Sequence, residues 1–426
     1  MSKKKIAVLG GGASGLMAAI TAAQAGAQVT VIEHKERVGR KILMTGNGKC
    51  NLTNLHMDNS FYYSHDLEKA MQILKRFTPE DTISFFKRIG LMTKEKRDGG
   101  IYPVAEQAAV VLDILRSTCE QLQVKTILQC EIERIQPGKV IHLSGVLSIP
   151  LETDTKSGKK DKGKQSKICK KEKYEDSFDA LILACGGCAA MVSGSDGSGY
   201  HLARKLGCKV YEPVPALVQL YGKGDFYKSI AGVRTESAIK LLIDNQAVSE
   251  EYGELQITDY GISGIPVFQF SRIVSVELLR KKQCCVEIDF YPYDHDALAW
   301  DLHGNVSAEA FLEGYLNKKL AALILKRAGI RLDQKVSEIS KKSRDAVFSE
   351  IHHFMIPVEK TNGFDNAQVC AGGVSLKDVD DNLQMNNHPN IFITGELLDV
   401  DGKCGGYNLQ WAWTTGYLAG CAAAKL

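Results

Sequence analysis

A glycine-rich turn between a strand and a helix constrains the fold of this chain more than any other sequence feature. Apolar residues at Lys5–Leu9 predict a buried strand that ends at the glycines 10–12, and an alanine-rich helix is expected over Leu16–Ala25. A second strand is expected over Gln28–Ile32. A strand, a glycine turn, a helix and a second strand in this order predict a Rossmann-type α/β unit at the start of the chain.

The turn itself, at residues 10–15, fits the G-x-G-x-x-G pattern of dinucleotide-binding sites. Gly10 permits the tight turn, Gly12 lets a diphosphate approach the backbone, and Gly15 lets the helix pack closely on the strand. Ala13 and Ser14 lead into the expected helix, where free amide groups would hold the phosphates. The alternative is a glycine-rich turn that binds no ligand.

Glu33 lies directly after the second expected strand, where its carboxylate would accept hydrogen bonds from ribose hydroxyls. An acidic residue at this place favours FAD or NAD over NADP, whose ribose carries a phosphate. The glycine pattern does not occur a second time in the 426 residues. We therefore expect non-covalent FAD as the resident cofactor and NAD(P)H as a transient electron donor.

Two further segments have the composition of a flavin site. Residues 39–54 combine small turns, cations and side-chain amides, which suit diphosphate and ribityl oxygens. Residues 395–412 run from Gly-Glu through a Gly-Gly turn into a helix, whose amide groups would stabilise the N1/O2 edge of a reduced isoalloxazine. Either segment alone is also compatible with a structural loop. The expected FAD contacts are Arg40, Lys41, Gly48, Lys49, Cys50 and Asn51 from the first segment, and Gly395, Glu396, Gly406, Tyr407, Asn408 and Leu409 from the second.

The rest of the chain predicts that this dinucleotide-binding fold is interrupted by an insertion. Helical spacing occurs at residues 66–90, 105–123 and 307–352, and strands are expected at 124–135, 140–149 and 180–184. Short alternating stretches between 213 and 290 predict an antiparallel β domain. The expected class is α/β, with a Rossmann-like FAD-binding domain built from residues 1–199 and 369–426, an inserted β domain at 200–295 and 353–368, and a helical insert at 296–352.

Three stretches resemble those of one known family: T-G-N-G-K-C-N-L-T-N at residues 45–54, the turn Gly194–Gly197, and G-E-L-L-D-V-D-G-K-C-G-G-Y-N-L-Q-W-A-W at 395–413. The chain is similar over nearly its whole length to the YhiN-like flavoproteins, also called aminoacetone oxidase-like, which include BaiN-type bile-acid reductases. The resemblance implies FAD between two Rossmann-like halves, with a β-barrel and helices inserted. It adds His34, Ile132, Gly186 and Asp196 to the expected FAD contacts. Residues 99–103 (Gly-Gly-Ile-Tyr-Pro) depart from the family's Gly-Arg-x-Phe-Pro pattern, so no substrate role is carried over there.

Composition narrows the expected partners and location. The net charge is +3, from 53 Lys and Arg against 50 Asp and Glu, so nothing global indicates nucleic acid or a membrane as a partner. The longest nearly apolar run, residues 180–192, is too short to cross a bilayer, and twelve cysteines without a secretory signal favour a reduced, cytoplasmic protein. Residues 151–173 carry nine lysines and four acids, so a solvated loop is expected there, with a polyanion-binding arm as the alternative.

Several cysteines allow both a structural and a functional interpretation. Cys185 and Cys188 have the spacing of a redox dithiol or of two zinc ligands, but no second pair at zinc-finger spacing accompanies them. Packing at a strand end is therefore expected for them, and no metal site. Cys50 and Cys404 lie inside the two flavin segments, where they either pack or influence the flavin.

The remaining candidates are aromatic. His352 and His353 are expected on the surface, whereas Trp411 and Trp413 are expected in the core, with a substrate wall as the alternative. Tyr102 and the expected FAD contact Tyr407 have the chemistry of a hydrogen-bond donor or acid. The sequence places neither tyrosine relative to a substrate, so no catalytic residue is assigned.

The expected function is NAD(P)H-driven reduction of a C=C bond conjugated to a carbonyl, in a hydrophobic small molecule such as a 3-oxo-Δ4 or Δ4,6 steroid. This reaction needs a hydride donor, a group that hydrogen-bonds the carbonyl, and an acid that protonates the α-carbon. One alternative is an oxidase of small aminoketones that uses O2. Another is a non-catalytic flavin-dependent binding protein, directed to RNA by the lysine-rich segment.

Overall fold

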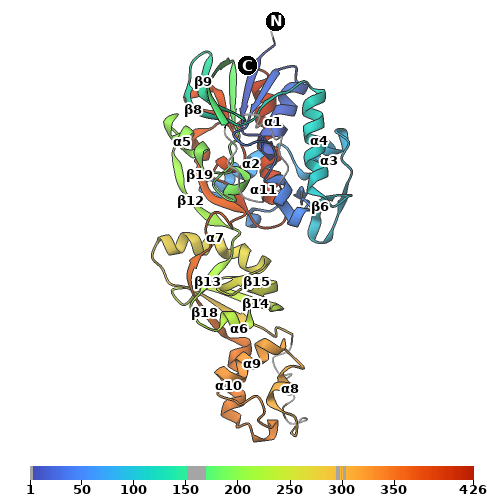
Figure 1. Cartoon of the computed structure of the whole chain (residues 1–426), viewed down its shortest axis with the longest axis vertical. Helices are drawn as coiled ribbons and strands as arrows, with labels where there is room; N and C mark the ends of the chain where they lie inside the picture. Colours follow the sequence, from blue (N-terminus) through green and yellow to red (C-terminus); the bar gives the residue numbers. More distant parts are fainter. Residues whose placement is uncertain (1–2, 151–168, 294–297, 299, 301–303) are drawn as a thin grey trace, which may run out of the picture. The chain divides into compact units, whose positions relative to one another are not determined.

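The computed structural model describes residues 3–150, 169–293, 298, 300 and 304–426. The chain divides into two compact units: unit 1 contains Met1–Pro213 and Val369–Leu426, and unit 2 contains Val214–Gln368. Figure 1 shows both ends of the chain, in blue and red, within unit 1. The expected boundary after residue 199 falls inside helix α5 (Ser198–Lys205), and unit 1 continues to Pro213.

A six-stranded sheet in the order β20-β21-β11-β1-β2-β7 forms the centre of unit 1. β1 (Lys5–Leu9) pairs in parallel with β2 (Gln28–Ile32) and β11 (Ala180–Leu183), which confirms these expected strands. All four residues of β11 are buried, as in parallel sheets covered on both faces. The sheet is completed by β7 (Lys125–Ile127) and β21 (His388–Ile393), both parallel, and by β20 (Gln384–Met385), antiparallel to β21.

The first and last helices of unit 1 cross closely. α1 (Ala13–Gln24) begins three residues earlier than expected, because Gly12 is its N-cap. α11 (Tyr407–Ala423) approaches α1 at a glycine, since a Cβ added to Gly416 would lie 2.3 Å from the Ser14 carbonyl oxygen. This contact requires glycine and holds the two chain ends together.

Proline divides another helical region. The helix expected over 66–90 is two helices, α2 (Leu67–Leu74) and α3 (Pro79–Arg88). Pro79 cannot continue a helix, but it suits the first turn of a new one, which the Thr78 side chain caps. α4 (Ala108–Gln121) confirms the helix expected at 105–123.

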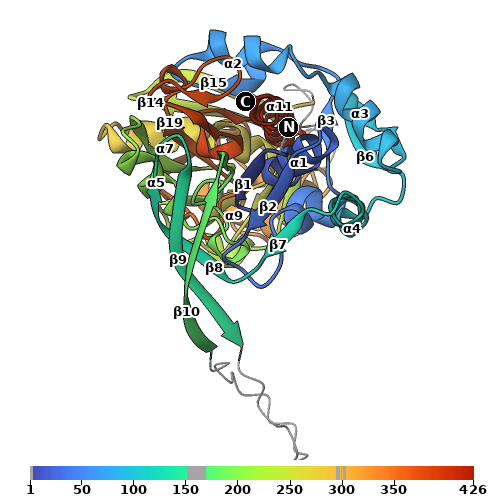
Figure 2. The same cartoon turned by 90° about the horizontal axis from the view of Figure 1, so that it is seen from above.

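A three-stranded antiparallel sheet contains β8 (Cys130–Gln136), β9 (Ile141–Pro150) and β10 (Cys169–Phe178), of which β9 and β10 extend as a hairpin (Figure 2). Within the lysine-rich segment 151–173, residues 151–168 lie outside the described residues. The loop prediction is wrong for residues 169–173, because the backbone of β10 pairs with β9 from residue 169 onward.

Short strands complete unit 1 and bring distant segments together. β4 (Tyr62–Tyr63) pairs with β22 (Asp401–Gly402), so residues from both ends of the chain share one ladder. The others are β3 (Thr53–Asn54), β6 (Gly100–Pro103) and β5 (Thr93–Glu95), which form one sheet, and β12 (Val210–Ala216), which pairs with β19 (Val369–Val374).

Unit 2 is a closed antiparallel barrel with helices, which confirms the expected barrel. Its strands, in barrel order, are β13 (Leu220–Gly222), β16 (Gly261–Ser263), β15 (Gln246–Ile257), β14 (Arg234–Ile243), β17 (Cys284–Asp289) and β18 (Phe354–Thr361). Its helices are α6 (Tyr227–Ile230), α7 (Ile265–Leu279), α8 (Ala308–Leu312), α9 (Lys318–Arg327) and α10 (Lys341–His352).

The sequence misses one element of unit 2 and places one residue wrongly. The missed element is α7, whose many β-branched and aromatic residues are more typical of strands. It is a helix because Val267, Phe270 and Val274, spaced three and four apart, enter the core together. His352 is 3% exposed and its Nδ1 lies 3.0 Å from Asp289 Oδ1, so only its neighbour His353 is on the surface.

No helix among the described residues combines the length and the apolar character that are needed to cross a membrane.

Candidate functional site

The glycine turn lies at the carboxyl end of β1, between the sheet and α1. A Cβ on Gly10 would lie 2.4 Å from the Ala184 carbonyl oxygen, and one on Gly15 would lie 2.0 Å from the Gly10 carbonyl oxygen. These two glycines are therefore required by packing alone. Gly12 differs, because a Cβ built there has no heavy atom within 4 Å among the described residues, apart from those adjacent in the chain. The open side of Gly12 faces space that packing does not use, which is what a bound diphosphate requires.

Glu33 joins the turn to the second strand. Its Oε2 accepts a hydrogen bond from the Gly11 amide at 2.9 Å, and its Oε1 accepts one from the Lys35 amide at 2.9 Å. These two bonds hold the carboxylate in place just after β2. They also compensate for its burial, since Glu33 is only 8% exposed. Each oxygen accepts one of these bonds and keeps lone-pair capacity for a ribose hydroxyl.

Three more expected FAD contacts gather beside Glu33. His34 Nδ1 lies 3.2 Å from Glu33 Oε1, and His34 Nε2 lies 3.6 Å from Asp196 Oδ2. Burial opposes the charge of Asp196, but hydrogen bonds from the Ser198 hydroxyl and amide outweigh it and lower the pKa of this carboxyl. Gly186, at φ +71°, follows β11 and would place a Cβ 3.2 Å from Ser195 Oγ. These residues form the polar end of the candidate site.

Replacing Glu33 by alanine should weaken FAD binding about 10- to 150-fold, since a hydrogen bond to a charged group contributes on the order of 1.5–3 kcal/mol. Titration of the apoprotein with FAD measures this change. Glu120→Ala, which removes an exposed carboxylate from α4, is the matched control and should leave the affinity unchanged. Equal affinities for both variants would remove Glu33 from the cofactor site.

Residues from the two chain ends meet next to the turn. A Cβ on Gly395, at φ +68°, would lie 2.5 Å from Ser14 Oγ, so the last segment packs directly on the first helix. Lys41 Nζ lies 2.7 Å from Glu396 Oε2, and Glu396 Oε1 accepts a hydrogen bond from the Cys370 amide at 2.8 Å. Lys41 and Glu396, which the sequence assigned separately, therefore form one ion pair.

The segment 45–54 reaches the start of α11 through Asn51. A Cβ on Gly406 would lie 3.0 Å from Asn51 Oδ1, and a Cβ on Gly100 would lie 3.3 Å from both Asn51 Nδ2 and Tyr102 Cε2. Asn51 Oδ1 is buried and makes no hydrogen bond within the described part of the chain. A buried acceptor without a partner is costly. It therefore marks a position where a bound group with an N–H or O–H donor would fit.

The start of α11 is held rigidly. Gly406, its N-cap, adopts φ +98° and brings no side chain to the helix start. The Asn408 side chain is already engaged, with Oδ1 accepting from the Gly402 amide at 2.8 Å and Nδ2 donating to the Gly402 carbonyl at 2.7 Å. If Asn408 contacts FAD as expected, the contact would therefore come from its backbone amide and not from its side chain. Trp411 and Trp413 are buried and donate to the Gly395 and Leu52 carbonyls, which assigns both to the core.

Both candidate tyrosines lie near this helix start. Tyr407 stacks on Phe61 with ring centroids 4.7 Å apart, and burial raises its pKa to about 12. Tyr102 is partly exposed beside Asn51, and burial raises its pKa as well, although Lys96 opposes this. Both phenols therefore remain protonated near neutral pH and can donate a hydrogen bond.

The other expected contacts lie at the edges of this group. Arg40 pairs with Glu36 at 3.1 Å, and Lys49 with Glu106 at 3.6 Å. Ile132 is buried in β8, which runs beside Glu33 because the Cys130 amide donates to the Glu33 carbonyl. The remaining three are Gly48, at φ +80° with open space at its Cβ position, Ala13 at the first turn of α1, and Leu409, which packs on the core.

The cysteines are arranged differently from the sequence pattern. Cys185 Sγ donates to the Leu9 carbonyl at 3.5 Å, whereas Cys188 Sγ lies 3.3 Å from Cys370 Sγ. Sequence spacing gives no signal for Cys370, because 182 residues separate it from Cys188. Cys50 is buried at φ +57°, and burial raises the pKa of its thiol to about 11, which favours a packing role. The described residues contain no group of three metal-binding side chains.

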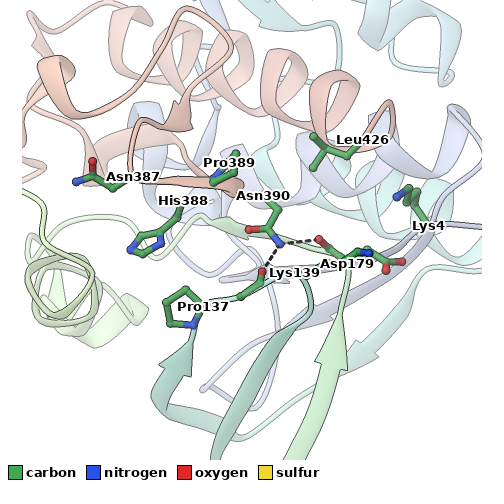
Figure 3. Close-up of a pocket in the computed structure, with 10 residues that line it drawn as sticks. Lys4, Pro137, Lys139, Asp179, Asn387, His388, Pro389, Asn390 and Leu426 are labelled. Atoms are coloured by element: carbon green, nitrogen blue, oxygen red, sulfur yellow. Dashed lines mark hydrogen bonds between the residues drawn. The ribbon is translucent and has the colours of Figure 1, made fainter.

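A surface hollow of about 560 Å³ lies at the opposite end of the sheet (Figure 3). Its lining includes Lys4 and Asp179, which directly precede β1 and β11, and Asn390, which lies in the first half of β21. Asn390 Nδ2 donates hydrogen bonds to the Asp179 carbonyl at 3.1 Å and to the Gly138 carbonyl at 3.0 Å (Figure 3). Part of the polar lining is therefore already satisfied. Ligands of α/β sheets bind at the carboxyl ends of the strands, so we place the site at the glycine turn.

The sheet and the glycine turn together define a dinucleotide-binding α/β protein of the Rossmann type. The model of the HI0933-like protein Rossmann domain family matches residues 4–422. This chain therefore belongs to the HI0933-like family, and the resemblance to YhiN-like flavoproteins is confirmed.

Named relatives match the whole chain. It is 42% identical over 434 residues to the 3-dehydro-bile acid delta(4,6)-reductase of Clostridium scindens, covering 99% of each chain. It is 30% identical over 429 residues to the ribosomal RNA dihydrouridine synthase of Haemophilus influenzae, covering 98% of each. Among solved structures, it is similar to the 3-ketosteroid-delta4-(5alpha)-dehydrogenase of Rhodococcus jostii RHA1 in complex with 4-androstene-3,17-dione, with a TM-score of 0.49, 15% identity, and 100% and 97% of the two chains covered.

Proposed function

We propose that this protein is an FAD-dependent oxidoreductase that reduces a C=C bond conjugated to a carbonyl, with NAD(P)H as electron donor. The proposed substrate is a hydrophobic 3-oxo-Δ4 or Δ4,6 steroid of the bile-acid type. The observation that carries the proposal is the 42% identity, over 99% of both chains, to a 3-dehydro-bile acid delta(4,6)-reductase. The open glycine turn and the buried acceptor at Asn51 support a bound dinucleotide.

FAD bound in unit 1 would supply hydride transfer to the substrate. The amides at the start of α1 and the open side of Gly12 would hold its diphosphate, and Glu33 its adenosine ribose. The Lys41–Glu396 pair would contact the ribityl chain, and Asn51 would face the ring. The amides at the start of α11 would place partial positive charge where a reduced ring carries negative charge.

Tyr102 is our candidate for the proton donor of this reaction. Its phenol stays protonated, and its ring lies beside Asn51 and Gly46, where a Cβ would be 3.7 Å from Tyr102 Cε1. Tyr102→Phe should slow substrate reduction about 10²- to 10⁴-fold, the usual contribution of a general acid. FAD content and flavin reduction by NAD(P)H should be unchanged, and stopped-flow absorbance separates the two half-reactions. A Tyr102→Phe enzyme that reduces substrate at the original rate would eliminate this assignment.

Anaerobic mixing tests the function as a whole. Bleaching of the bound flavin by NADH or NADPH, followed by its reoxidation with a 3-oxo-Δ4,6 bile acid and loss of the C=C absorbance, is the expected result. Bleaching by an aminoketone instead, with O2 as acceptor, would establish the oxidase alternative. A flavin that neither donor reduces would favour the non-catalytic alternative and refute the proposed reaction.

A second candidate function follows from the relative named ribosomal RNA dihydrouridine synthase. The uracil ring contains a C=C bond conjugated to a carbonyl, so the same chemistry would serve a nucleobase substrate. The lysine-rich segment 151–173 is the feature of this chain that suits a polyanion. Adding unmodified ribosomal RNA in place of the bile acid decides between them, because only the true substrate reoxidises the flavin and gains two hydrogens by mass spectrometry. Reoxidation by RNA alone would replace the steroid proposal and overturn the expectation of no nucleic-acid partner.

A further inference from the structure

Two cysteines from distant parts of unit 1 face each other beside the candidate FAD site. Cys188 follows β11, and Cys370 lies in β19. Their sulfur atoms are 3.3 Å apart, and the Cys188 amide donates a hydrogen bond to Cys370 Sγ at 3.1 Å. A disulfide requires about 2.05 Å between the sulfurs, so a shift of little more than 1 Å would join them.

The two thiols differ in exposure and in charge. Cys188 is partly exposed, whereas Cys370 is 1% exposed. A hydrogen bond from the Cys370 thiol lowers the pKa of Cys188, and Lys41 acts in the same direction, while burial and the Glu396 and Glu212 carboxylates oppose it. The same hydrogen bond raises the pKa of Cys370, together with burial. A partly exposed thiol of lowered pKa next to a buried thiol is the arrangement of an attacking and a resolving cysteine.

The surroundings hold both sulfurs in place. A Cβ on Gly187 would lie 3.0 Å from Cys370 Sγ and 3.0 Å from the Tyr200 hydroxyl, so glycine is needed between them. The Tyr200 hydroxyl donates to the Glu396 carbonyl at 3.3 Å, and the Glu396 carboxylate accepts from the Cys370 amide. Glu396, whose carboxylate also pairs with Lys41, therefore holds the backbone of Cys370 in place beside Cys188.

We propose that Cys188 and Cys370 are a peroxide-reactive site that forms a reversible disulfide. The Cys188 thiolate attacks one oxygen of hydrogen peroxide, which breaks the O–O bond, releases hydroxide and leaves a sulfenic acid on Cys188. The Cys370 thiol then attacks the Cys188 sulfur, an S–S bond forms, and the hydroxyl leaves with the thiol proton as water. Peroxide takes up the two electrons that the two sulfurs lose, and an added dithiol returns them.

The site is tested on the full-length protein, reduced, freed of reductant and exposed to hydrogen peroxide near pH 7. Remaining thiols are alkylated under denaturing conditions, and the digest is analysed by mass spectrometry without reduction. A peptide pair joining Cys188 to Cys370, abolished by dithiothreitol, is expected, formed at least about tenfold faster than any other cysteine is oxidised. Because the hydrogen bond from the Cys370 thiol lowers the pKa of Cys188, the rate should reach half its maximum at a lower pH than the rate of a free cysteine does.

Two variants keep the test decisive. In Cys370→Ser the reaction should stop at a sulfenic acid on Cys188 that dimedone traps, whereas Cys421→Ser, at the far end of α11, should still form the disulfide. Alkylation of both Cys188 and Cys370 after peroxide treatment, or a sulfinic acid on Cys188 with Cys370 still free, would overturn the proposal. None of these measurements depends on FAD or on a substrate, so their failure leaves the proposed function untouched.

Discussion

Replacing Gly12 by valine should produce a folded protein that does not bind FAD. The backbone at Gly12 has φ −81° and ψ −164°, which any residue adopts, and the space at its Cβ position is open among the described residues. The Cβ of a valine would therefore meet no described residue other than its neighbours in sequence. It would fill the volume needed by the diphosphate and hold it away from the amides of α1. We expect the affinity to fall more than about 100-fold, which corresponds to about 3 kcal/mol.

Flavin absorbance after dialysis and titration of the apoprotein measure this effect, and circular dichroism checks the fold. Gly363→Val is a matched control, because Gly363 in unit 2 also has open space at its Cβ position and no positive φ. Gly15→Val is unsuitable, since its side chain would collide with the Gly10 carbonyl and disturb the fold itself. A Gly12→Val protein that retains its flavin would show that the diphosphate does not lie on this turn.

The largest expected loss of stability comes from Gln410→Leu. Gln410 is fully buried in α11, where its Oε1 accepts hydrogen bonds from the Thr53 and Thr82 hydroxyls at 2.6 and 2.9 Å. Its Nε2 donates to the Phe77 carbonyl at 2.9 Å and to Thr414 Oγ1 at 3.0 Å. Leucine would leave the buried Thr53 and Thr82 hydroxyls without their acceptor, at a cost of about 1–3 kcal/mol each, whereas Thr414 Oγ1 still donates to the Phe77 carbonyl at 2.8 Å. The expected total is about 3–5 kcal/mol.

Thermal unfolding followed by circular dichroism should show a Tm lower by about 5–10 °C for the Gln410→Leu apoprotein. Gln72→Leu makes the same chemical change on the exposed face of α2 and should stay within about 0.5 kcal/mol of the original protein. The apoprotein is used so that any loss of FAD does not contribute. If the two variants unfold at the same temperature, Gln410 does not link α11 to β3 and α3 as the structure indicates.

Local chemistry explains why the first strand, helix and strand of the fold were predictable. β1 and β2 were located to the residue, because each is a short apolar run bounded by residues that cannot extend it. Gly10 and Gly15 are informative in the sequence for a local reason too, because backbone atoms of the folded turn leave no room for a Cβ at either position. Where local preference and packing disagree, as in α7, the sequence pattern misses the helix, because packing in the core decides the structure.

The sequence alone determined that the chain begins with a dinucleotide-binding turn and that its last segment belongs with it, because those residues have few other uses. Only the tertiary structure decided how they meet. Gly395 packs on Ser14, and Lys41 pairs with Glu396 across 355 residues of sequence. The same is true of Cys188, whose spacing suggested Cys185 as partner, while the fold placed Cys370 beside it. The physical reason is that sequence spacing predicts contacts only between residues that are close along the chain. The packing of β11, β19 and α11 brings residues together whatever their separation in sequence.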